Sequence, residues 1–304
     1  MSPRKSFEEI AKSNVANLVD YAVGNLGLDE ADVVYVTNIL LDMLKLTEPA
    51  PAPSEDYDFY TTLGALSEYA VKKNICEEAD RLLFETKLMG VLTPPPSKVI
   101  EKFDNIAAYE GSMKAAKWLG ELSEKSAYIR RPDIDRNIQW EYDNPRGKIV
   151  ITINLAEKTP EEVRRAKEAK TGYPKCLLCA ENVGFAGNAG HPARQTLRTI
   201  PFELDGEEWF MQFSPFVYFE EHVIVISREH RPMNVTEATF RRMLDFVDLF
   251  PDYFIGSNAA LPIVGGSILA HDHYQGGKKV LPIFKCSGRK YYLMKDFPEV
   301  NVSI

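Results

Sequence analysis

The stretch QTLRTIPFELDGEEWFMQFSPFVYFEEHVIVIS, residues 195–227, decides the fold class. Its β-branched and aromatic residues fall into three runs, QTLRTIPFEL, EEWFMQFSPFVYF and EHVIVIS, which is typical of neighbouring β-strands. The first two runs are joined at Asp205 and Gly206, a dipeptide that favours a tight hairpin turn. The sequence therefore predicts an antiparallel sheet in this part of the chain.

The segments on either side of this stretch add a helix and more strands. Residues 236–250 have apolar side chains at helical spacing, and residues 253–269 predict a strand, a turn and a second strand. Residues 138–155 predict a hairpin around the turn Asn-Pro-Arg-Gly. Residues 159–170 predict a helix, because Thr159 suits the N-cap and a proline follows at the first helical position.

The first 130 residues have the helical period instead. Proline-rich breaks and glycines separate the predicted helices, which cover residues 7–27, 29–46, 59–75, 77–92 and 97–126. We therefore expect an α+β protein. A helical N-terminal section over residues 1–135 precedes an antiparallel sheet with a packed helix over residues 136–304.

Composition excludes several classes of function. The net charge of -8 argues against a nucleic-acid partner held by bulk electrostatics, although a local cluster of donors can still bind a small anion. No apolar run is long enough to span a membrane, and the first residues lack the apolar core of a secretory signal. Four cysteines in 304 residues do not make a disulfide framework. We therefore expect a cytoplasmic protein without a membrane partner.

Cys176 and Cys179 form a C-x-x-C pair, a spacing at which two thiolates can bind one tetrahedral metal ion. A glycine-rich loop follows, whereas a redox pair of the thioredoxin type leads into a helix. The chain has no second C-x-x-C, so histidines are the expected remaining ligands. The candidates are His191, His222, His230, His271 and His273. The alternative is a pair of structural cysteines.

The segment GGSILAHDHYQGG, residues 265–277, concentrates two of the five histidines between two Gly-Gly pairs. One imidazole can face a metal or a structural partner while the other faces a substrate. A neutral histidine can attack phosphorus and leave again, so it can serve in nucleotidyl transfer. The glycines at 265, 266, 276 and 277 would let the backbone approach a phosphate.

This motif, HDHYQGG, resembles the active-site motif of the galactose-1-phosphate uridylyltransferases, within the histidine-triad superfamily. The blocks CLLCAENVGFAG, FSPFVYFEEHVIVISREHRPM and FPDYFIGSNAALPIVGGSILAHDHYQGG resemble consecutive blocks of the longer bacterial branch of that family. The resemblance spans most of the chain. It implies that the sheet over residues 136–304 is histidine-triad-like and forms the N-terminal catalytic domain.

The resemblance also implies roles for individual residues. His273 matches the nucleophile that becomes uridylylated, and Gln275 matches a glutamine that hydrogen-bonds the phosphoryl oxygens. Gly266 and Ser267 match a phosphate-contacting turn, and Asn258 matches an asparagine that supports the phosphate. Hydrolytic relatives carry a third histidine at the position of Gln275, and a glutamine cannot shuttle a proton to water.

Other matches concern the metal and the base. The resemblance aligns Cys176, Cys179, His230 and His271 with zinc ligands of the shorter branch. It places Leu177 and Leu178 against the uracil ring. Arg194 is a further candidate, because a guanidinium suits bidentate phosphate recognition.

Together these matches imply an enzyme that exchanges UMP between UDP-glucose and galactose 1-phosphate through a uridylyl-histidine, with a structural zinc. Its partners would be UDP-glucose, UDP-galactose and hexose 1-phosphates, and a homodimer is left open. Members of the branch continue beyond the point where this chain stops. The alternatives are therefore a histidine-triad-type nucleotide hydrolase or phosphorylase, or a nucleotide-binding module without transferase activity.

Overall fold

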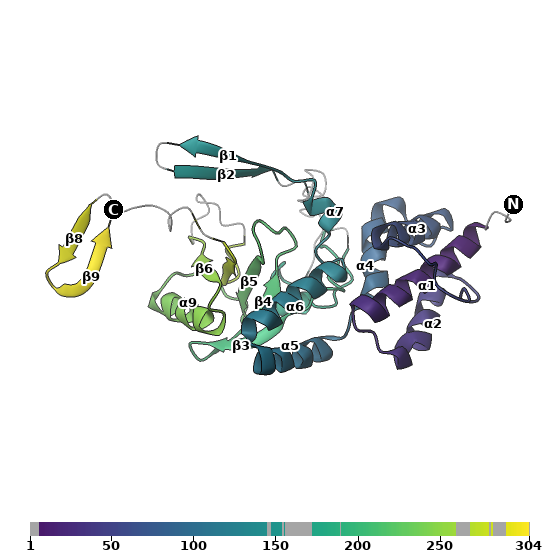
Figure 1. Ribbon diagram of the computed structural model, residues 1–304, viewed down its shortest axis with the longest axis horizontal. Coiled ribbons are helices and arrows are strands. Elements are labelled where there is room, and N and C mark those ends of the chain that lie inside the picture. The colour runs from purple at the N-terminus through teal and green to yellow at the C-terminus, as the bar shows by residue number, and fades with distance from the viewer. Residues whose placement is uncertain are drawn as a thin grey trace.

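The computed structural model describes residues 6–144, 147–153, 155, 172–188, 190–259, 268–279, 281 and 290–303 of the chain. Helices come first and antiparallel sheets follow, so the predicted α+β class is confirmed (Figure 1). Within the described residues, no helix is long and apolar enough to cross a bilayer.

Four helices form a bundle at the N-terminal end. α1 begins at a capping box in which the Ser6 and Glu9 side chains bond each other's backbone N–H. α1 contacts α2 and α3, and α4 contacts both of those helices as well. Leucines such as Leu18, Leu40 and Leu66 are fully buried at these contacts. The bounds are α1 (Phe7–Asn25), α2 (Val33–Leu44), α3 (Phe59–Lys72) and α4 (Arg81–Leu92), with short 3-10 turns η1 (Glu30–Asp32) and η2 (Glu78–Asp80).

The next two helices belong with the sheet. α5 (Pro96–Glu110) starts with a proline at its first position, and α6 (Ser112–Lys125) follows after Gly111, which divides the helical stretch of residues 97–126 in two. α5 contacts β3 and α6 contacts β4. A Cβ atom at Gly120 would lie 2.9 Å from the Phe213 ring, so α6 lies close to the sheet. The division of the chain near residue 135 stays a proposal.

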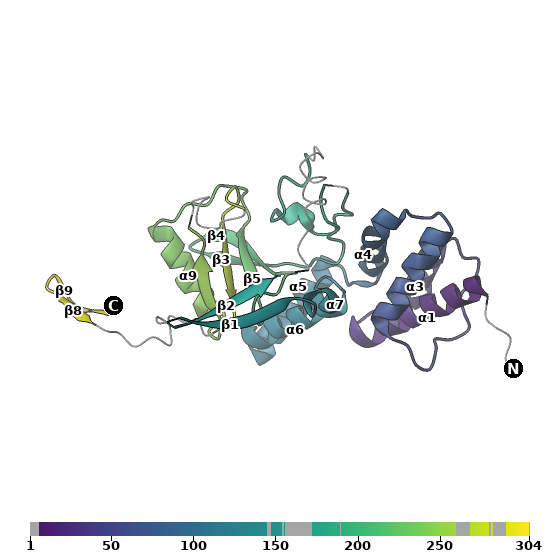
Figure 2. The same cartoon turned by 90° about the horizontal axis from the view of Figure 1, so that it is seen from above.

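The central sheet has five antiparallel strands in the order β3-β4-β5-β7-β6. α9 (Glu237–Leu249) contacts β3 and β6 and flanks the sheet in Figure 2. Phe246 of α9 is fully buried in the same core as Met211 and Tyr274. The strands are β3 (Ile200–Leu204), β4 (Glu207–Phe213), β5 (Val223–Ser227), β6 (Phe254–Ser257) and β7 (His273–Gly277).

Two parts of the strand prediction were wrong. The first run was expected to be strand over residues 195–204, but β3 begins at Ile200. The aromatic run over residues 214–219 was expected to extend the second strand, but β4 ends at Phe213. Pro215 cannot donate to a ladder, and Val217 and Glu221 have φ of 45° and 50°. These residues form a turn segment that leads into β5.

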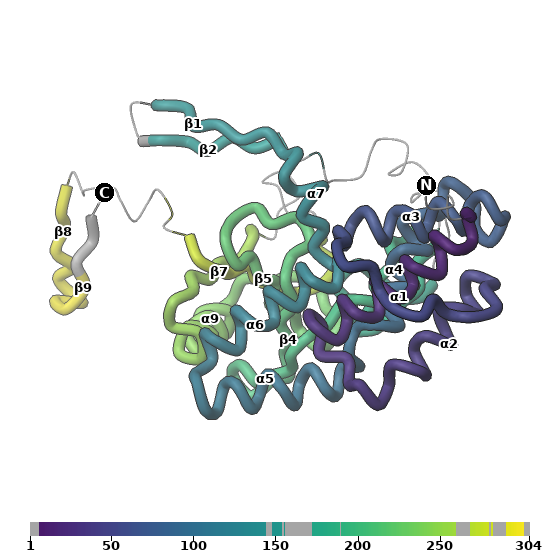
Figure 3. The backbone as a smooth tube through the Cα atoms, turned by 45° about the vertical axis from the view of Figure 1, so that its right-hand side comes forward, coloured from purple at the N-terminus to yellow at the C-terminus, as the bar shows by residue number. Residues whose placement is uncertain are grey.

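Two hairpins lie outside this sheet. β1 (Ile138–Asn144) pairs with β2 (Gly147–Ile153), as predicted, and the pair projects beyond α7 (Arg131–Ile134), as Figure 3 shows. β8 (Tyr291–Met294) pairs with β9 (Phe297–Ser303) and lies apart from the sheet (Figures 1 and 2). The predicted helix over residues 159–170 and most of the second strand predicted within residues 253–269 fall outside the described residues.

Candidate functional site

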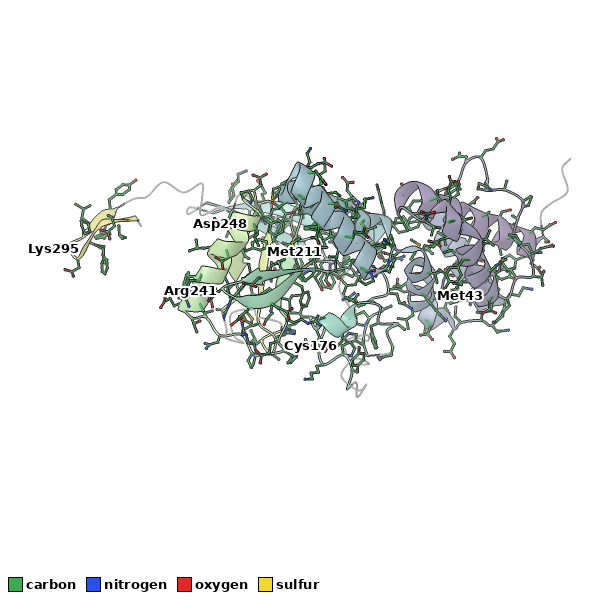
Figure 4. All side chains as sticks on the ribbon, turned by 90° about the horizontal axis from the view of Figure 1, so that it is seen from below. Met43, Cys176, Met211, Arg241, Asp248 and Lys295 are labelled. Atoms are coloured by element: carbon green, nitrogen blue, oxygen red, sulfur yellow. The ribbon has the colours of Figure 1, made fainter. Side chains whose placement is uncertain are left out.

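Four thiol and imidazole groups converge beside the sheet. The ligand atoms of Cys176, Cys179, His230 and His271 all lie within 4.8 Å of one another. Cys176 Sγ lies 3.3 Å from His271 Nδ1, and Cys179 Sγ lies 3.1 Å from His230 Nδ1. The two sulfurs are 3.5 Å apart. Figure 4 labels Cys176 on one side of the sheet and Met211 on the helix side.

These distances fit a tetrahedral ion. Zn–S bonds of about 2.3 Å and Zn–N bonds of about 2.0 Å give ligand-to-ligand separations of about 3.3–3.8 Å. Burial raises the pKa of the Cys179 thiol to about 11, and the hydrogen bond with Cys176 acts in the same direction. A bound cation would displace that proton, as thiolate coordination requires. The group can therefore bind a metal ion.

Two polar side chains hold the C-x-x-C turn in shape. The Asn182 amide, on η3 (Ala180–Asn182), donates to the backbone oxygens of both Cys176 and Cys179, each at 2.8 Å. His191 Nε2 lies 2.6 Å from Asn182 Oδ1. His191, a candidate ligand in the sequence, thus supports the turn and does not belong to the group of four.

His271 presents a defined nitrogen to the sulfurs. Its Nε2 lies 2.8 Å from the Ser227 carbonyl oxygen, which can only accept, so Nε2 carries the proton. Burial lowers the pKa of His271 below its ordinary value, which keeps the ring neutral. Nδ1 is then unprotonated and faces the thiols, as in metal-binding histidines whose other nitrogen is held by a carbonyl.

His273, the first residue of β7, carries its proton on the other ring nitrogen. Its Nδ1 lies 2.8 Å from the His271 carbonyl oxygen and therefore donates to it. Burial lowers the pKa of His273, and the side chain is only 5% exposed. In the neutral ring Nε2 carries a free lone pair. The arrangement can therefore supply a nucleophilic nitrogen near neutral pH.

Gln275 lies two residues further along β7, so its side chain is on the same face as His273. Its Oε1 lies 3.1 Å from His222 Nε2. His222 is 2% exposed, and burial lowers its pKa to about 4. The sequence offered His222 as one of five candidate metal ligands, but the structure places it outside that group, and nothing in the sequence pointed to its partner.

An apolar patch lies on this face beside the histidines. Leu178 packs on Phe210 and Ile226, with Ile224 and Ile268 at its edge. Ile226 is directly opposite His273 in the ladder, so patch and imidazole share a face. Leu178 is buried and Leu177 is half-buried. This arrangement can hold a flat ring next to His273.

Asn258 and Arg194 approach the same face from opposite sides. Asn258 follows β6 directly. Because Ser257 pairs with Tyr274, continuing the register by one residue places Asn258 opposite His273. Arg194 lies over the Tyr128 ring at 5.6 Å, and the Tyr128 hydroxyl is 3.5 Å from Gln212 Nε2. Gln212 stands in the same row of the sheet as Gln275. Gly265, Gly266 and Ser267 lie outside the described residues.

The second Gly-Gly pair is closely packed against neighbouring residues. A Cβ at Gly276 would lie 2.8 Å from the Phe254 carbonyl oxygen and 3.3 Å from the Phe246 ring. Gly277 has a φ of 148°, and a Cβ there would lie 2.5 Å from the Glu221 carbonyl oxygen. Close packing is sufficient to explain both glycines, and the phosphate role expected for this pair stays a prediction.

Asp272, between the two histidines, faces neither water nor an imidazole nitrogen. It is 4% exposed, and Arg231 Nε lies 3.4 Å from its carboxylate. Burial raises its pKa and the Arg231 guanidinium lowers it. The Asp272 backbone also accepts from Ser227 N through its carbonyl oxygen and donates through its N–H to Arg231 O, so it joins the segment that carries His230 to the segment that carries His271.

Sequence reasoning missed Asn182 and the role of His222. Both act through hydrogen bonds to residues distant in the chain or to backbone oxygens. The resemblance had pointed to the four metal-binding candidates, and the structure brings all four together. Cys76 is half-buried and outside this group, and Cys286 lies outside the described residues.

Comparison with known proteins adds an independent finding. The family model for the galactose-1-phosphate uridyl transferase N-terminal domain matches residues 29–232. The galactose-1-phosphate uridylyltransferase of Caldanaerobacter subterraneus is 43% identical over 302 residues, covering 97% of this chain and 58% of the relative. That of Bacillus subtilis is 40% identical over 301 residues, covering 96% and 59%.

The galactose-1-phosphate uridylyltransferase of Butyrivibrio fibrisolvens is 40% identical over 301 residues, covering 96% of this chain and 77% of the relative. The chain spans less than two thirds of the length of the relatives from Caldanaerobacter and Bacillus. Solved structures offer no match to this chain.

Proposed function

The chain belongs to the galactose-1-phosphate uridyl transferase family, and on that premise we propose that it transfers UMP between UDP-glucose and galactose 1-phosphate. The observation that carries this proposal is the hydrogen bond from His273 Nδ1 to the His271 carbonyl oxygen. That bond fixes the proton on Nδ1 and leaves the Nε2 lone pair for attack on phosphorus.

The proposed reaction has two displacement steps. In the first, His273 Nε2 attacks the α-phosphorus of UDP-glucose, and the bond to the bridging oxygen breaks. Glucose 1-phosphate leaves with that electron pair, and uridylyl-His273 remains. In the second, a phosphate oxygen of galactose 1-phosphate attacks the same phosphorus, the P–N bond breaks, and UDP-galactose forms.

The neighbouring side chains have distinct tasks in this scheme. Gln275 donates to the phosphoryl oxygens as negative charge develops on them. The uracil ring rests against Leu177 and Leu178. Asn258 and Arg194 support the phosphates from the two sides of the face. Because Gln275 carries no transferable proton, it does not activate water, which favours transfer to a sugar phosphate.

The most direct test is detection of the covalent intermediate. Incubation with UDP-glucose should add one uridylyl group to the protein by mass spectrometry and release one equivalent of glucose 1-phosphate. Peptide mapping should find the group on His273. Steady accumulation of free UMP without an acceptor would favour a hydrolase, and absence of any adduct would leave a nucleotide-binding module.

We also propose that Cys176, Cys179, His230 and His271 bind a structural Zn²⁺. Four protein ligands leave no open position for substrate, so the ion would serve to join the C-x-x-C turn to the end of β7. Replacing Cys179 with serine should reduce zinc to well below one equivalent and lower the midpoint of thermal unfolding, because metal binding adds to folding free energy. The control is Cys76→Ser, which should keep the metal. Full zinc occupancy in Cys179→Ser would remove the assignment.

A further inference from the structure

His222 is a buried imidazole that the proposed reaction does not use. It follows Glu221, whose φ is 50°, and its carbonyl oxygen accepts from Ser214 N at 2.8 Å. The Phe219 ring lies 4.3 Å from its ring, and the Tyr218 ring lies 5.4 Å away. The backbone and two aromatic rings therefore fix the position of this side chain before β5 begins.

Among the described residues, the ring of His222 has one hydrogen-bond partner, Gln275. His222 Nε2 lies 3.1 Å from Gln275 Oε1. A carbonyl oxygen accepts only, so Nε2 carries the proton, and the burial of the ring favours the neutral form. Nδ1 is then a lone pair. Among the described residues Nδ1 is buried with no hydrogen-bond partner.

The opposite hydrogen-bond direction, in which Gln275 donates to His222, is less favourable for two reasons. If Gln275 donated to Nε2, the proton of His222 would sit on Nδ1, and a buried N–H would have no acceptor among the described residues. An orphaned buried N–H is rarer than an under-used acceptor. The Gln275 carbonyl oxygen would also point away from His222 toward the phosphate, where it would repel the phosphoryl oxygens.

We propose that His222 is a positioning residue: its Nε2–H holds Gln275 Oε1, and so directs the Gln275 NH₂ group toward phosphate at His273. This inference rests on the proposed function, because it assigns a purpose to Gln275 in that reaction. His222 also lines a cleft of about 880 Å³ between α6, the β1–β2 hairpin and the turn before β5.

Two variants separate the hydrogen bond from mere packing. His222→Phe keeps a planar ring but removes the donor. His222→Gln places an NH₂ donor near the position of Nε2. His222→Phe should slow formation of the uridylyl-His273 adduct about tenfold to a hundredfold, a partial loss of one transition-state donor. UDP-glucose binding should change little, and His222→Gln should recover most of the rate.

A double-mutant cycle decides whether His222 acts through Gln275. In a Gln275→Ala background, His222→Phe should have no further effect, because the group it orients is gone. An equal slowing in both backgrounds, or a wild-type rate in His222→Phe, would overturn the proposal. Unfolding midpoints and metal content of every variant show whether each compared protein is folded.

A measurement that needs no turnover distinguishes failure of the positioning role of His222 from failure of the proposed function. Nitrogen-15 spectra of histidine-labelled protein, assigned with His222→Gln, should show His222 as the neutral Nε2–H tautomer. An Nδ1–H tautomer would overturn the positioning role even if transfer proceeds. The Nε2–H tautomer together with no adduct from UDP-glucose would sink the proposed function instead.

Discussion

Neighbouring residues of β7 belong to two faces of the sheet that bury their side chains in different ways. Tyr274 lies on the helix-covered face, stacked on Trp209 with ring centroids 4.8 Å apart, in a large apolar core. His273 and Gln275 lie on the other face, where each has a directed hydrogen bond. The comparison shows that one strand buries its side chains in two ways: Tyr274 packs in the apolar core, whereas His273 and Gln275 on either side of it make directed hydrogen bonds.

The largest expected effect is a loss of transfer activity without a comparable loss of stability. His273→Asn keeps an N–H donor near the place of Nδ1 and removes Nε2. Transfer should fall about 10⁴-fold or more, because the nucleophile is lost. The free energy of unfolding should change by less than about 1 kcal/mol, since the bond to the His271 oxygen can persist. Label exchange between sugar pools and urea titration measure the two quantities. Substantial exchange by the folded variant would contradict the nucleophile.

Tyr274→Ala should show the opposite pattern. Truncating this fully buried ring leaves a cavity against Trp209, and costs about 3–5 kcal/mol of unfolding free energy. Gln275→Ala, the matched neighbour on the other face, should cost less than about 1 kcal/mol while slowing transfer about 10²-fold. Chemical denaturation of the two variants, with rates per folded molecule, would reveal whether the faces are separable.

Many elements of the fold and part of the candidate site could be predicted from the sequence. The features that could not be predicted depend on contacts between residues far apart in the chain. Strand runs and the helix of residues 236–250 follow from local periodicity, and C-x-x-C indicates a metal site. Spacing alone could not say that His230 and His271 join it, since they are 51 and 92 residues beyond Cys179; the resemblance supplied them. The reason for Gly276 lies in Phe246 and Phe254, which no local pattern connects to it.

A pH titration tests the buried polar face next. Burial lowers the pKa of His222 from 6.5 in the unfolded chain to about 4. The unfolded state therefore binds more protons between these values, and stability falls as pH falls through that window, by about 1.4 kcal/mol per pH unit for this group. The stability is fully present above pH 6.5. His222→Gln should show a correspondingly shallower loss between pH 6 and about 4.5. Identical pH dependence in both proteins would show that folding does not shift the pKa of His222.

The smallest effect comes from two glycines that lie side by side but on differently crowded surfaces. Gly276 would place a Cβ 2.8 Å from the Phe254 carbonyl oxygen and 3.3 Å from the Phe246 ring, and backbone cannot move aside cheaply. Gly276→Ala should therefore cost about 1–3 kcal/mol. At Gly256, which is opposite Gln275 in the ladder, a Cβ meets no described atom within 4 Å. Gly256→Ala should be neutral or stabilise by about 0.5 kcal/mol, because alanine restricts the unfolded chain. Equal costs at the two positions would mean that the face bearing His273 is as tightly packed as the helix-covered face, and that its open side does not accommodate a substrate.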